Sequence, residues 1–121
     1  MATVLVVDDS PTEIHVIQSI LSRHGYQVEI ASSGDEGVAK ARAVRPDLIL
    51  MDVVMPGMNG FQATRQLSRG SDTATIPVVI VTTKDQETDK VWGMRQGAKD
   101  YIVKPVREGE LLATVKAALV S

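Results

Sequence analysis

The sequence predicts an α/β fold built on a five-stranded parallel sheet with five helices, and three observations support this prediction. Short apolar runs alternate with helix-like segments five times along the chain. Three of the runs are rich in Val, Ile and Leu, as strands buried on both faces are. Every connection between these segments is short. A repeated strand–helix pattern implies parallel strands that are joined by right-handed crossovers.

The five apolar runs are the expected strands. They cover residues 3–7, 27–31, 47–51, 77–82 and 100–103. The second run reads Gln27-Val28-Glu29-Ile30 and alternates polar with apolar side chains. Such alternation is typical of a half-buried strand, so we expect this run at an edge of the sheet.

Capping residues mark where the first two helices begin. Ser10-Pro11-Thr12-Glu13 reads as a capping box with proline at the first helical position, and Gly25 is a natural stop for the helix that follows. Ser33 begins the second helix, and Glu36, three residues later, indicates another capping box. Each of these helices therefore follows directly after a predicted strand.

Three further helices are indicated by apolar stripes and by glycine stops. They are expected over about 59–69, over about 85–96, and over a last segment with Leu111, Val115 and Leu119 on one face. Gly70 and Gly97 stand at the ends of the first two of these helices, where glycine commonly terminates a helix.

Length, charge and composition favour one domain over residues 1–121 that binds neither nucleic acid nor membrane. The 121 residues include 13 Lys and Arg against 15 Asp and Glu, which gives a net charge of −2 without any long charged block. Aromatic side chains are too few for base stacking. The absence of cysteine fits a reducing compartment, and no apolar segment has the length of a signal peptide or membrane span, so we expect a cytoplasmic protein.

Charged side chains follow three of the predicted strands. Asp8 and Asp9 come directly after the first strand, Asp52 after the third and Lys104 after the fifth. The carboxyl ends of parallel strands meet at one edge of the sheet, where open α/β sheets bind their ligands. We therefore expect three carboxylates and one ammonium group in a single cleft.

This set of residues suits Mg²⁺-assisted phosphoryl transfer. Mg²⁺ prefers oxygen ligands, and a divalent cation relieves the repulsion between neighbouring carboxylates. A carboxylate can attack phosphorus to form an aspartyl phosphate, and Lys104 and the hydroxyl of Thr82 offer contacts to the phosphoryl oxygens. Each residue alone has an ordinary explanation as a helix cap, a turn residue or a solvated lysine. Their combination at the ends of different strands favours the site.

The motifs around these residues resemble the receiver domain of CheY-like response regulators, from Val4 to Leu119. The matching pieces are Val7-Asp8-Asp9-Ser10, residues 47–60, residues 77–82, residues 96–101 and Lys104-Pro105. The resemblance implies a flavodoxin-like, doubly wound sheet with strand order 2-1-3-4-5, the order found in flavodoxin and CheY.

The resemblance also implies the chemistry of the predicted cleft. Asp52 is expected to be the phosphoacceptor. Asp8, Asp9 and Asp52, together with the backbone carbonyl of Val54, are expected to hold Mg²⁺ as the cofactor.

Further roles implied by the resemblance concern phosphoryl contact and signalling. Lys104 is expected to contact the phosphoryl group, and the Lys104–Pro105 bond is expected to be cis. Thr82 is expected to contact the phosphoryl group too, and to form a switch pair with Tyr101, which turns inward on phosphorylation. Lys90, Met94, Tyr101 and Lys104 are expected on the face that meets partner proteins.

Two further segments, residues 60–67 and 81–98, are similar to stand-alone PilH-like regulators of twitching motility. This similarity implies that the phosphoryl donor is a chemotaxis-type histidine kinase or a phosphotransfer domain. It also implies a downstream protein target, such as a component of the type IV pilus motor.

The sequence leaves two classes of function open. The first is a single-domain response regulator of a two-component phosphorelay, which signals by protein–protein contact and is not an enzyme in the usual sense. The second is a Mg²⁺-dependent phosphatase that acts on an external substrate through Asp52. Phosphatases of that kind typically carry a second acid two residues after the nucleophile, where this chain has Val54. This difference favours the response regulator.

Overall fold

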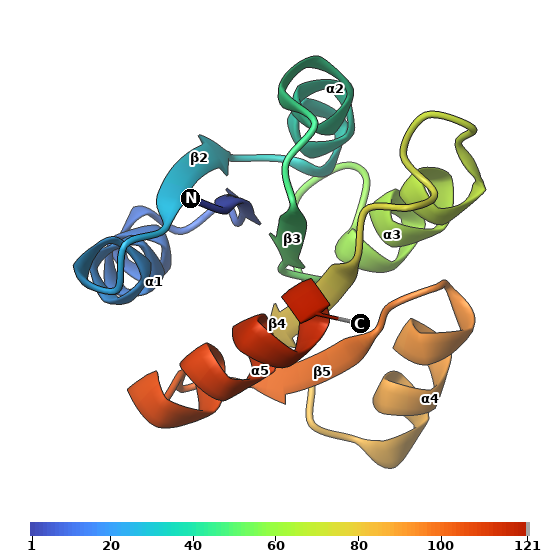
Figure 1. Cartoon of the computed structure of the whole chain (residues 1–121). Coiled ribbons are helices and arrows are strands. Elements are labelled where there is room, and N and C mark those ends of the chain that lie inside the picture. Colours follow the sequence, from blue (N-terminus) through green and yellow to red (C-terminus); the bar gives the residue numbers. More distant parts are fainter. Residues whose placement is uncertain (121) are drawn as a thin grey trace.

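A computed structural model describes residues 1–120 as a five-stranded parallel sheet with helices on both faces (Figure 1). The strand order is β2-β1-β3-β4-β5, which confirms the predicted doubly wound, flavodoxin-like fold, and the alternating strand lies at an edge as expected. Position 121, the last residue of the expected domain, lies outside the described residues. In chain order the elements are β1 (Thr3–Val7), α1 (Pro11–Arg23), β2 (Gln27–Ala31), α2 (Gly34–Val44), β3 (Leu48–Met51), α3 (Gly60–Arg69), β4 (Val78–Thr82), α4 (Glu87–Arg95), β5 (Asp100–Val103) and α5 (Glu108–Val120).

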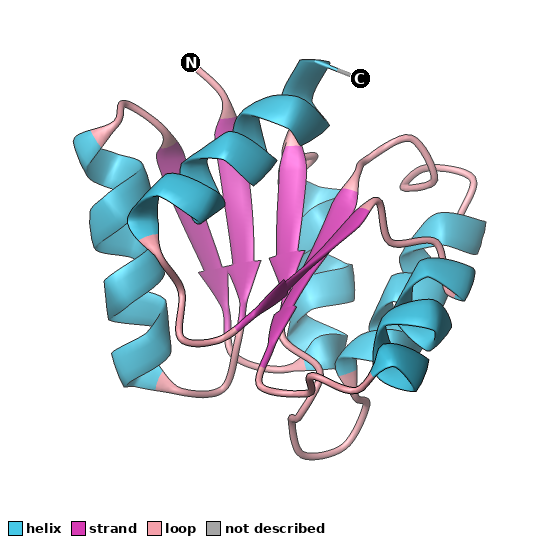
Figure 2. Cartoon of the chain, turned by 90° about the horizontal axis from the view of Figure 1, so that it is seen from below, coloured by secondary structure: helices cyan, strands magenta, loops and turns pink. Residues whose placement is uncertain are grey.

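Alternation along each strand decides which helices its side chains meet. In β1, Val4 and Val6 pack with apolar residues of α1 and α5, whereas Leu5 and Val7 pack with residues of α2 and α3 on the opposite face. Figure 1 shows α1 and α5 on one side of the sheet and α2 and α3 on the other, and Figure 2 shows the sheet enclosed between the layers. Because both faces are covered, the inner strands read as continuous apolar runs.

The register of the parallel strands brings their carboxyl ends to one edge of the sheet. Val7, the last residue of β1, pairs with Met51, the last residue of β3. Thr82, the last residue of β4, pairs with Val103, the last residue of β5. The residues that follow each strand are therefore neighbours at this edge, although they come from distant parts of the chain.

The serine caps of the first two helices form as predicted, but neither capping box closes as the sequence suggested. The Ser10 hydroxyl accepts the N–H of Glu13 at 3.3 Å, and the Ser33 hydroxyl accepts the N–H of Glu36 at 3.1 Å. The N–H of Ser10 donates to Asp8 rather than to Glu13. The Glu36 side chain accepts the N–H of Ser32 rather than that of Ser33. In α1 the nearby carboxylate of Asp8 takes the place of the expected capping partner.

Helix α4 begins two residues later than predicted and ends one residue earlier. Gln86 is its N-cap, and the N–H of Gln86 donates to the carboxylate of Asp89 at 3.2 Å. Gly97 follows the helix with a φ of +111°, which is the conformation that favours glycine at a helix end. None of the helices within residues 1–120 combines the length and the apolar character that crossing a membrane requires.

Truncation of a core side chain tests this packing. Leu5 is 0% exposed in the centre of β1, so Leu5→Ala should lower the free energy of unfolding by about 2–5 kcal/mol through lost apolar burial and a residual cavity. Val44→Ala, at a position that is 37% exposed, should change it by less than about 0.5 kcal/mol. Urea unfolding followed by circular dichroism measures both values, and equal losses for the two variants would contradict this description of the core.

Candidate functional site

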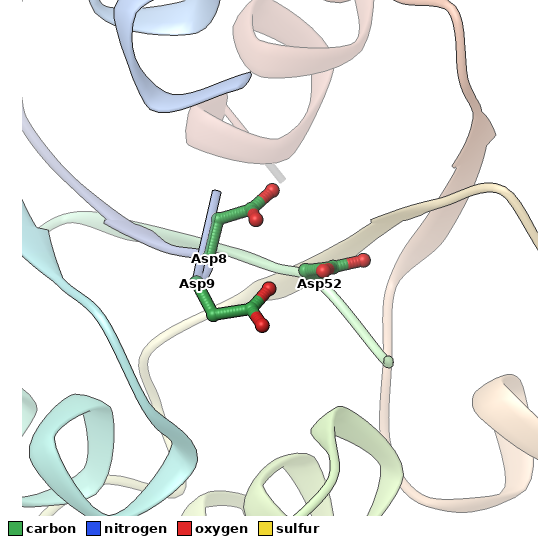
Figure 3. A group of neighbouring side chains, drawn as sticks. All are labelled: Asp8, Asp9 and Asp52. Carbon is green, nitrogen blue, oxygen red and sulfur yellow. The ribbon is translucent and has the colours of Figure 1, made fainter. Parts of the chain in front are cut away.

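Three carboxylates meet at the carboxyl edge of the sheet (Figure 3). Asp8 and Asp9 follow β1 and Asp52 follows β3, which is the neighbouring strand. One carboxylate oxygen from each acid lies within 4.8 Å of the other two. Asp8 is 2% exposed and Asp52 is 6% exposed, whereas Asp9 is open to solvent. The structure therefore brings together the three acids that the sequence placed at one edge.

Lys104 reaches the same cluster from beyond β5. Its Nζ donates to Oδ2 of Asp8 at 2.8 Å and lies 3.7 Å from Oδ1 of Asp52. A carboxylate oxygen of Glu13, on α1, lies 3.6 Å from the same nitrogen. Strand β4 separates β5 from β3, so a long side chain is needed to span this distance. The Lys104 side chain is only 8% exposed, and its ammonium group is a counter-charge that these carboxylates share.

The pKa of Asp52 shows that this counter-charge is incomplete. Burial, and then the negative charge of Asp8, raise the pKa of Asp52 from 3.8 to about 6, against the opposing effect of Lys104. For Lys104 itself, burial disfavours the charged form, but the hydrogen bond to Asp8 and the nearby carboxylates outweigh burial and hold its pKa above the ordinary value. Lys104 is therefore charged at neutral pH, and the cluster keeps an excess of negative charge.

The donor set fits a hard divalent cation. All three acids offer oxygen, which suits Mg²⁺ better than softer metals. After burial, the negative charge of Asp8 contributes to the raised pKa of Asp52, and a bound cation relieves this repulsion. Mg²⁺ usually keeps several water ligands, and the exposed carboxylate of Asp9 leaves one side of the cluster open to water. Asp8, Asp9 and Asp52 are accordingly the residues suited to hold the metal.

The backbone carbonyl of Val54 was expected to be a further metal ligand. It accepts no hydrogen bond from residues 1–120, so its oxygen is available. The Val54 side chain is 56% exposed, next to the acidic cluster in sequence. The role of this carbonyl as a ligand stays a prediction.

Gly60 lets the first turn of α3 approach the residue that follows β3. A Cβ at this position would collide with the carbonyl oxygen of Asp52 and lie 2.7 Å from the Cα of Val53. The N–H of Gly60 donates to the carbonyl of Val53 at 3.0 Å, which closes the loop after Asp52. Only glycine permits this approach, so Gly60 fixes where the backbone of Asp52 lies.

The backbone of Lys84 connects the two residues that were expected to form a switch pair. Its N–H donates to Oγ1 of Thr82 at 3.4 Å, and its carbonyl accepts the hydroxyl of Tyr101 at 2.8 Å. Thr82 is fully buried at the end of β4, and Tyr101 is half-buried on β5. Burial, and then the charges of Asp89 and Asp85, raise the pKa of Tyr101 to about 12, so its hydroxyl remains a donor at neutral pH.

The four residues expected on the partner face do not all lie at the surface. Met94 is 46% exposed on α4, and Lys90 and Tyr101 are half-buried nearby on α4 and β5. The Lys104 side chain is turned into the acidic cluster instead. The surface that this set offers is therefore made by Lys90, Met94 and Tyr101.

Sequence reasoning did not assign three residues of this region to the site. Glu13 was assigned only to a helix cap, and the backbone contacts of Lys84 depend on how the loop after β4 folds. Gly60 ends the motif of residues 47–60, but no physical role was predicted for it. A glycine eight residues after Asp52 was the one available signal, because a glycine at a helix start indicates close backbone approach.

A family model described as the response regulator receiver domain matches residues 4–116. This match covers most of the chain, and the fold and the acidic cluster agree with it. The chain therefore belongs to the receiver domain family of response regulators.

Within this family the chain is similar to Protein PilH of Pseudomonas aeruginosa, with 61% identity over 119 residues that cover 98% of each chain. It is 41% identical to the transcriptional regulatory protein PhoP of Bacillus subtilis over 96% of this chain, but spans only 48% of that longer protein. The predicted resemblance to CheY-like and PilH-like regulators is confirmed.

Solved structures agree with this assignment. The chemotaxis protein CheY4 of Vibrio cholerae superposes with a TM-score of 0.92 at 37% identity, over 98% of this chain and 99% of that one. The receiver domain of the sensor histidine kinase PA1611 of Pseudomonas aeruginosa superposes with a TM-score of 0.92 at 29% identity, over 99% of this chain and 98% of that one. The PA1611 structure is described with a magnesium ion coordinated in its active site cleft.

Neutralising Asp52 should stabilise the metal-free protein in a pH-dependent way. The folded state binds the Asp52 proton more tightly than the unfolded state, so stability falls as pH rises from about 4 to about 6 and stays lower above that range. The difference between 3.8 and about 6 corresponds to on the order of 3 kcal/mol. Asp52→Asn should therefore raise the free energy of unfolding at pH 7.5 in EDTA.

The increase in the free energy of unfolding caused by Asp52→Asn should shrink toward zero at pH 4, where the wild-type carboxyl is protonated. Urea unfolding at pH 4, 5, 6 and 7.5 measures the trend. Asp85→Asn neutralises an exposed carboxylate and is the control, which should show no such pH trend. An advantage of Asp52→Asn that is constant with pH would contradict the assignment of charge to this cluster.

Proposed function

We propose that this chain is a stand-alone response regulator that accepts a phosphoryl group onto Asp52 and signals by protein–protein contact. The donor is a phosphohistidine of a histidine kinase or of a phosphotransfer domain. The observation that carries the proposal is the convergence of Asp8, Asp9, Asp52 and Lys104 on one edge of the sheet. The 61% identity to PilH over 98% of each chain supports a regulator of the PilH type.

Asp52 is the proposed acceptor because its surroundings suit an attacking carboxylate. A carboxylate oxygen of Asp52 forms a bond to phosphorus, while the bond from phosphorus to the donor imidazole nitrogen breaks and its electron pair stays on the imidazole. With a pKa of about 6, Asp52 is mostly ionised at neutral pH and so has an electron pair to donate. Because Lys104 lies 3.7 Å from Asp52, it can hold a phosphoryl oxygen that is attached there.

Asp8, Asp9 and Asp52 are proposed to hold Mg²⁺, with the carbonyl of Val54 as a further ligand. The bound metal supplies positive charge that offsets the charge developing on the phosphoryl oxygens. Asp8 is also fixed by Lys104 and by the N–H of Ser10, so the carboxylate most deeply buried in the cluster is oriented before the metal binds.

Thr82 and Tyr101 are proposed to report phosphorylation to the surface. A phosphoryl group on Asp52 offers an acceptor for the Thr82 hydroxyl, and the contact between Thr82 and Lys84 then changes. Lys84 also accepts the hydrogen bond of Tyr101, so both side chains respond to one backbone segment. Lys90, Met94 and Tyr101 are the proposed partner surface.

The proposed pathway is a chemotaxis-like phosphorelay that acts on type IV pili and twitching motility. The 61% identity to PilH supports the pilus connection, and the superposition with the chemotaxis protein CheY4 supports the chemotaxis-type donor. The partner is then a protein such as a pilus motor component. We place the exchange in the cytoplasm, because histidine kinases draw on intracellular ATP.

The alternative function is a Mg²⁺-dependent phosphatase that turns over an external substrate through Asp52. Such an enzyme needs a general acid beside the nucleophile. The position two residues after Asp52 is Val54, and Glu13 contacts Lys104 rather than Asp52. The site therefore favours a phosphoacceptor, which takes up one phosphoryl group on Asp52, over an enzyme that turns over many substrate molecules.

Mg²⁺ should stabilise the fold through the acidic cluster. A ligand that binds only the folded state at 100 times its dissociation constant adds about 2.7 kcal/mol. Thermal unfolding in 10 mM Mg²⁺ should therefore give a higher midpoint than in EDTA, and Asp9→Asn should reduce this increase. Asp85→Asn is the matched control and should keep it. An equal Mg²⁺ effect in the Asp9 and Asp85 variants would contradict the proposed metal site.

Phosphorylation can be measured without the cognate kinase. With Mg²⁺ and acetyl phosphate, the intact mass of the wild type should increase by one phosphoryl group, because a small phosphodonor needs only the acceptor, the metal and Lys104. Asp52→Asn should show no increase, and Lys104→Ala should be phosphorylated at least about tenfold more slowly. A mass increase that persists in Asp52→Asn, or multiple turnover of an added phosphomonoester, would point to the alternative.

A further inference from the structure

Glu13, in the first turn of α1, places a further carboxylate beside the acidic cluster. Its Oε1 lies 3.6 Å from Nζ of Lys104. Glu13 does not belong to the group of three acids, drawn in Figure 3, whose oxygens lie within 4.8 Å of one another. It is therefore neither part of the donor set proposed for Mg²⁺ nor the proposed phosphoacceptor, and its contact with Lys104 has no role in the chemistry described so far.

The way in which α1 is capped directs the Glu13 side chain toward Lys104. Ser10 is the N-cap, and its hydroxyl accepts the N–H of Glu13 at 3.3 Å. In a capping box the side chain at the third helical position accepts the N–H of the cap residue in return. Here the N–H of Ser10 donates to Oδ1 of Asp8 at 2.9 Å instead. Because Asp8 takes this capping role, the carboxylate of Glu13 extends to the ammonium group of Lys104.

Three carboxylates share the ammonium group of Lys104 in the resting protein. Nζ donates to Asp8 at 2.8 Å and lies 3.6 Å from Glu13 and 3.7 Å from Asp52. The Lys104 side chain is 8% exposed and that of Glu13 is 36% exposed. Charges that are partly withdrawn from water are screened less than charges at an open surface. The attraction of Glu13 therefore contributes to where the ammonium group lies.

Of these three carboxylates, Glu13 is the one whose attraction for Lys104 does not weaken when the site is loaded. A metal ion bound at Asp8 offsets the charge of that carboxylate. A bond from Asp52 to phosphorus removes the charge of the attacking oxygen. Glu13 is proposed neither to bind the metal nor to take up phosphorus, so its charge stays as it was. A phosphoryl oxygen on Asp52 must draw Lys104 toward itself against this attraction.

We propose that Glu13 is a positioning residue that restrains Lys104 and so limits how readily Asp52 accepts a phosphoryl group. This inference rests on the proposed phosphotransfer function and adds a regulatory element to the same site. Glu13 acts through Lys104 alone, because its carboxylate attracts the ammonium group that would otherwise contact the phosphoryl oxygen. The site is then phosphorylated more slowly than its acids and its lysine would allow by themselves.

Removal of the Glu13 carboxylate tests the restraint. In Mg²⁺ and acetyl phosphate, an oxygen of Asp52 bonds to phosphorus while the bond from phosphorus to the acetate oxygen breaks, and acetate leaves with the electron pair. Glu13→Gln should increase the initial rate of the gain in intact mass about threefold, which is the size expected for a partly exposed ion pair. Glu13→Asp keeps the charge but is one methylene shorter, so it should also react faster than the wild type.

Glu36→Gln is the matched control. Glu36 holds the same third position in α2, where the hydroxyl of Ser33 accepts its N–H, as that of Ser10 does for Glu13. Its carboxylate accepts the N–H of Ser32 and forms no ion pair with residues 1–120. The control removes the same charge at the same helical position and should leave the rate unchanged. Circular dichroism verifies that each variant is folded.

A double-mutant cycle with Lys104→Ala separates restraint of Lys104 from other effects of the Glu13 charge. In the Lys104→Ala background, Glu13→Gln should leave the rate unchanged, because the side chain through which Glu13 acts is missing. Repulsion of the anionic donor, or a role in capping α1, would change the rate equally in both backgrounds. The comparison of Glu13→Gln with Glu13→Asp needs no Lys104 variant and so decides the question even if Lys104→Ala does not fold.

The outcomes distinguish this inference from the function on which it rests. A wild type that gains no phosphoryl group contradicts the proposed function and this inference with it. If the wild type is phosphorylated, a Glu13→Gln rate no higher than that of the wild type overturns the inference alone. So does a Glu13→Asp variant that reacts as slowly as the wild type, or an acceleration by Glu13→Gln that persists in the Lys104→Ala background.

Discussion

Repulsion among three carboxylates at one edge of the sheet is the constraint on which this structure depends. Two of them, Asp8 and Asp52, are almost fully buried, and among residues 1–120 Lys104 supplies the ammonium group that contacts both. Breaking a buried ion pair usually costs more than the pair contributes, because the remaining charge is left without a partner. Removal of Lys104 would therefore leave buried carboxylates without their counter-charge, and even with Lys104 in place burial, and then the charge of Asp8, raise the pKa of Asp52.

The architecture sustains this unfavourable arrangement by surrounding it with rigid elements. Both layers of helices bury the strands, so the ends of β1 and β3 cannot move apart without exposing apolar surface. Gly60 packs the start of α3 directly against the backbone of Asp52. The stability of the core thus holds the acids in place, and a cation or a phosphoryl group that enters the site meets a preorganised set of charges.

The site is connected to the surface through one short segment after β4. Lys84 contacts the buried Thr82 with its N–H and the half-buried Tyr101 with its carbonyl. Helix α4 follows immediately and exposes Val91, Trp92 and Met94. The proposed partner surface of Lys90, Met94 and Tyr101 therefore lies on the elements that directly follow the segment in contact with Thr82.

The sequence alone determined the fold class, the order of elements and the edge at which the acids meet. Apolar runs, serine caps and the glycines at helix ends are local signals, and the positions of Asp8, Asp9, Asp52 and Lys104 after their strands needed only the rule that parallel strands end together. The boundaries predicted for α3 and α4 were accurate to within two residues. The boundaries of α4 were the least accurate, because Asp89 caps this helix by reaching back to Gln86.

Only the tertiary structure decided how far each charge is compensated. Glu13 was assigned to a helix cap but lies beside Lys104, and Lys104 was expected partly at the surface but is enclosed. The burial that raises the pKa of Asp52, the close approach at Gly60 and the bridging role of Lys84 arise from segments that are far apart in sequence. Sequence patterns report which residues share a strand end or a helix face, whereas distances between side chains depend on how the layers pack.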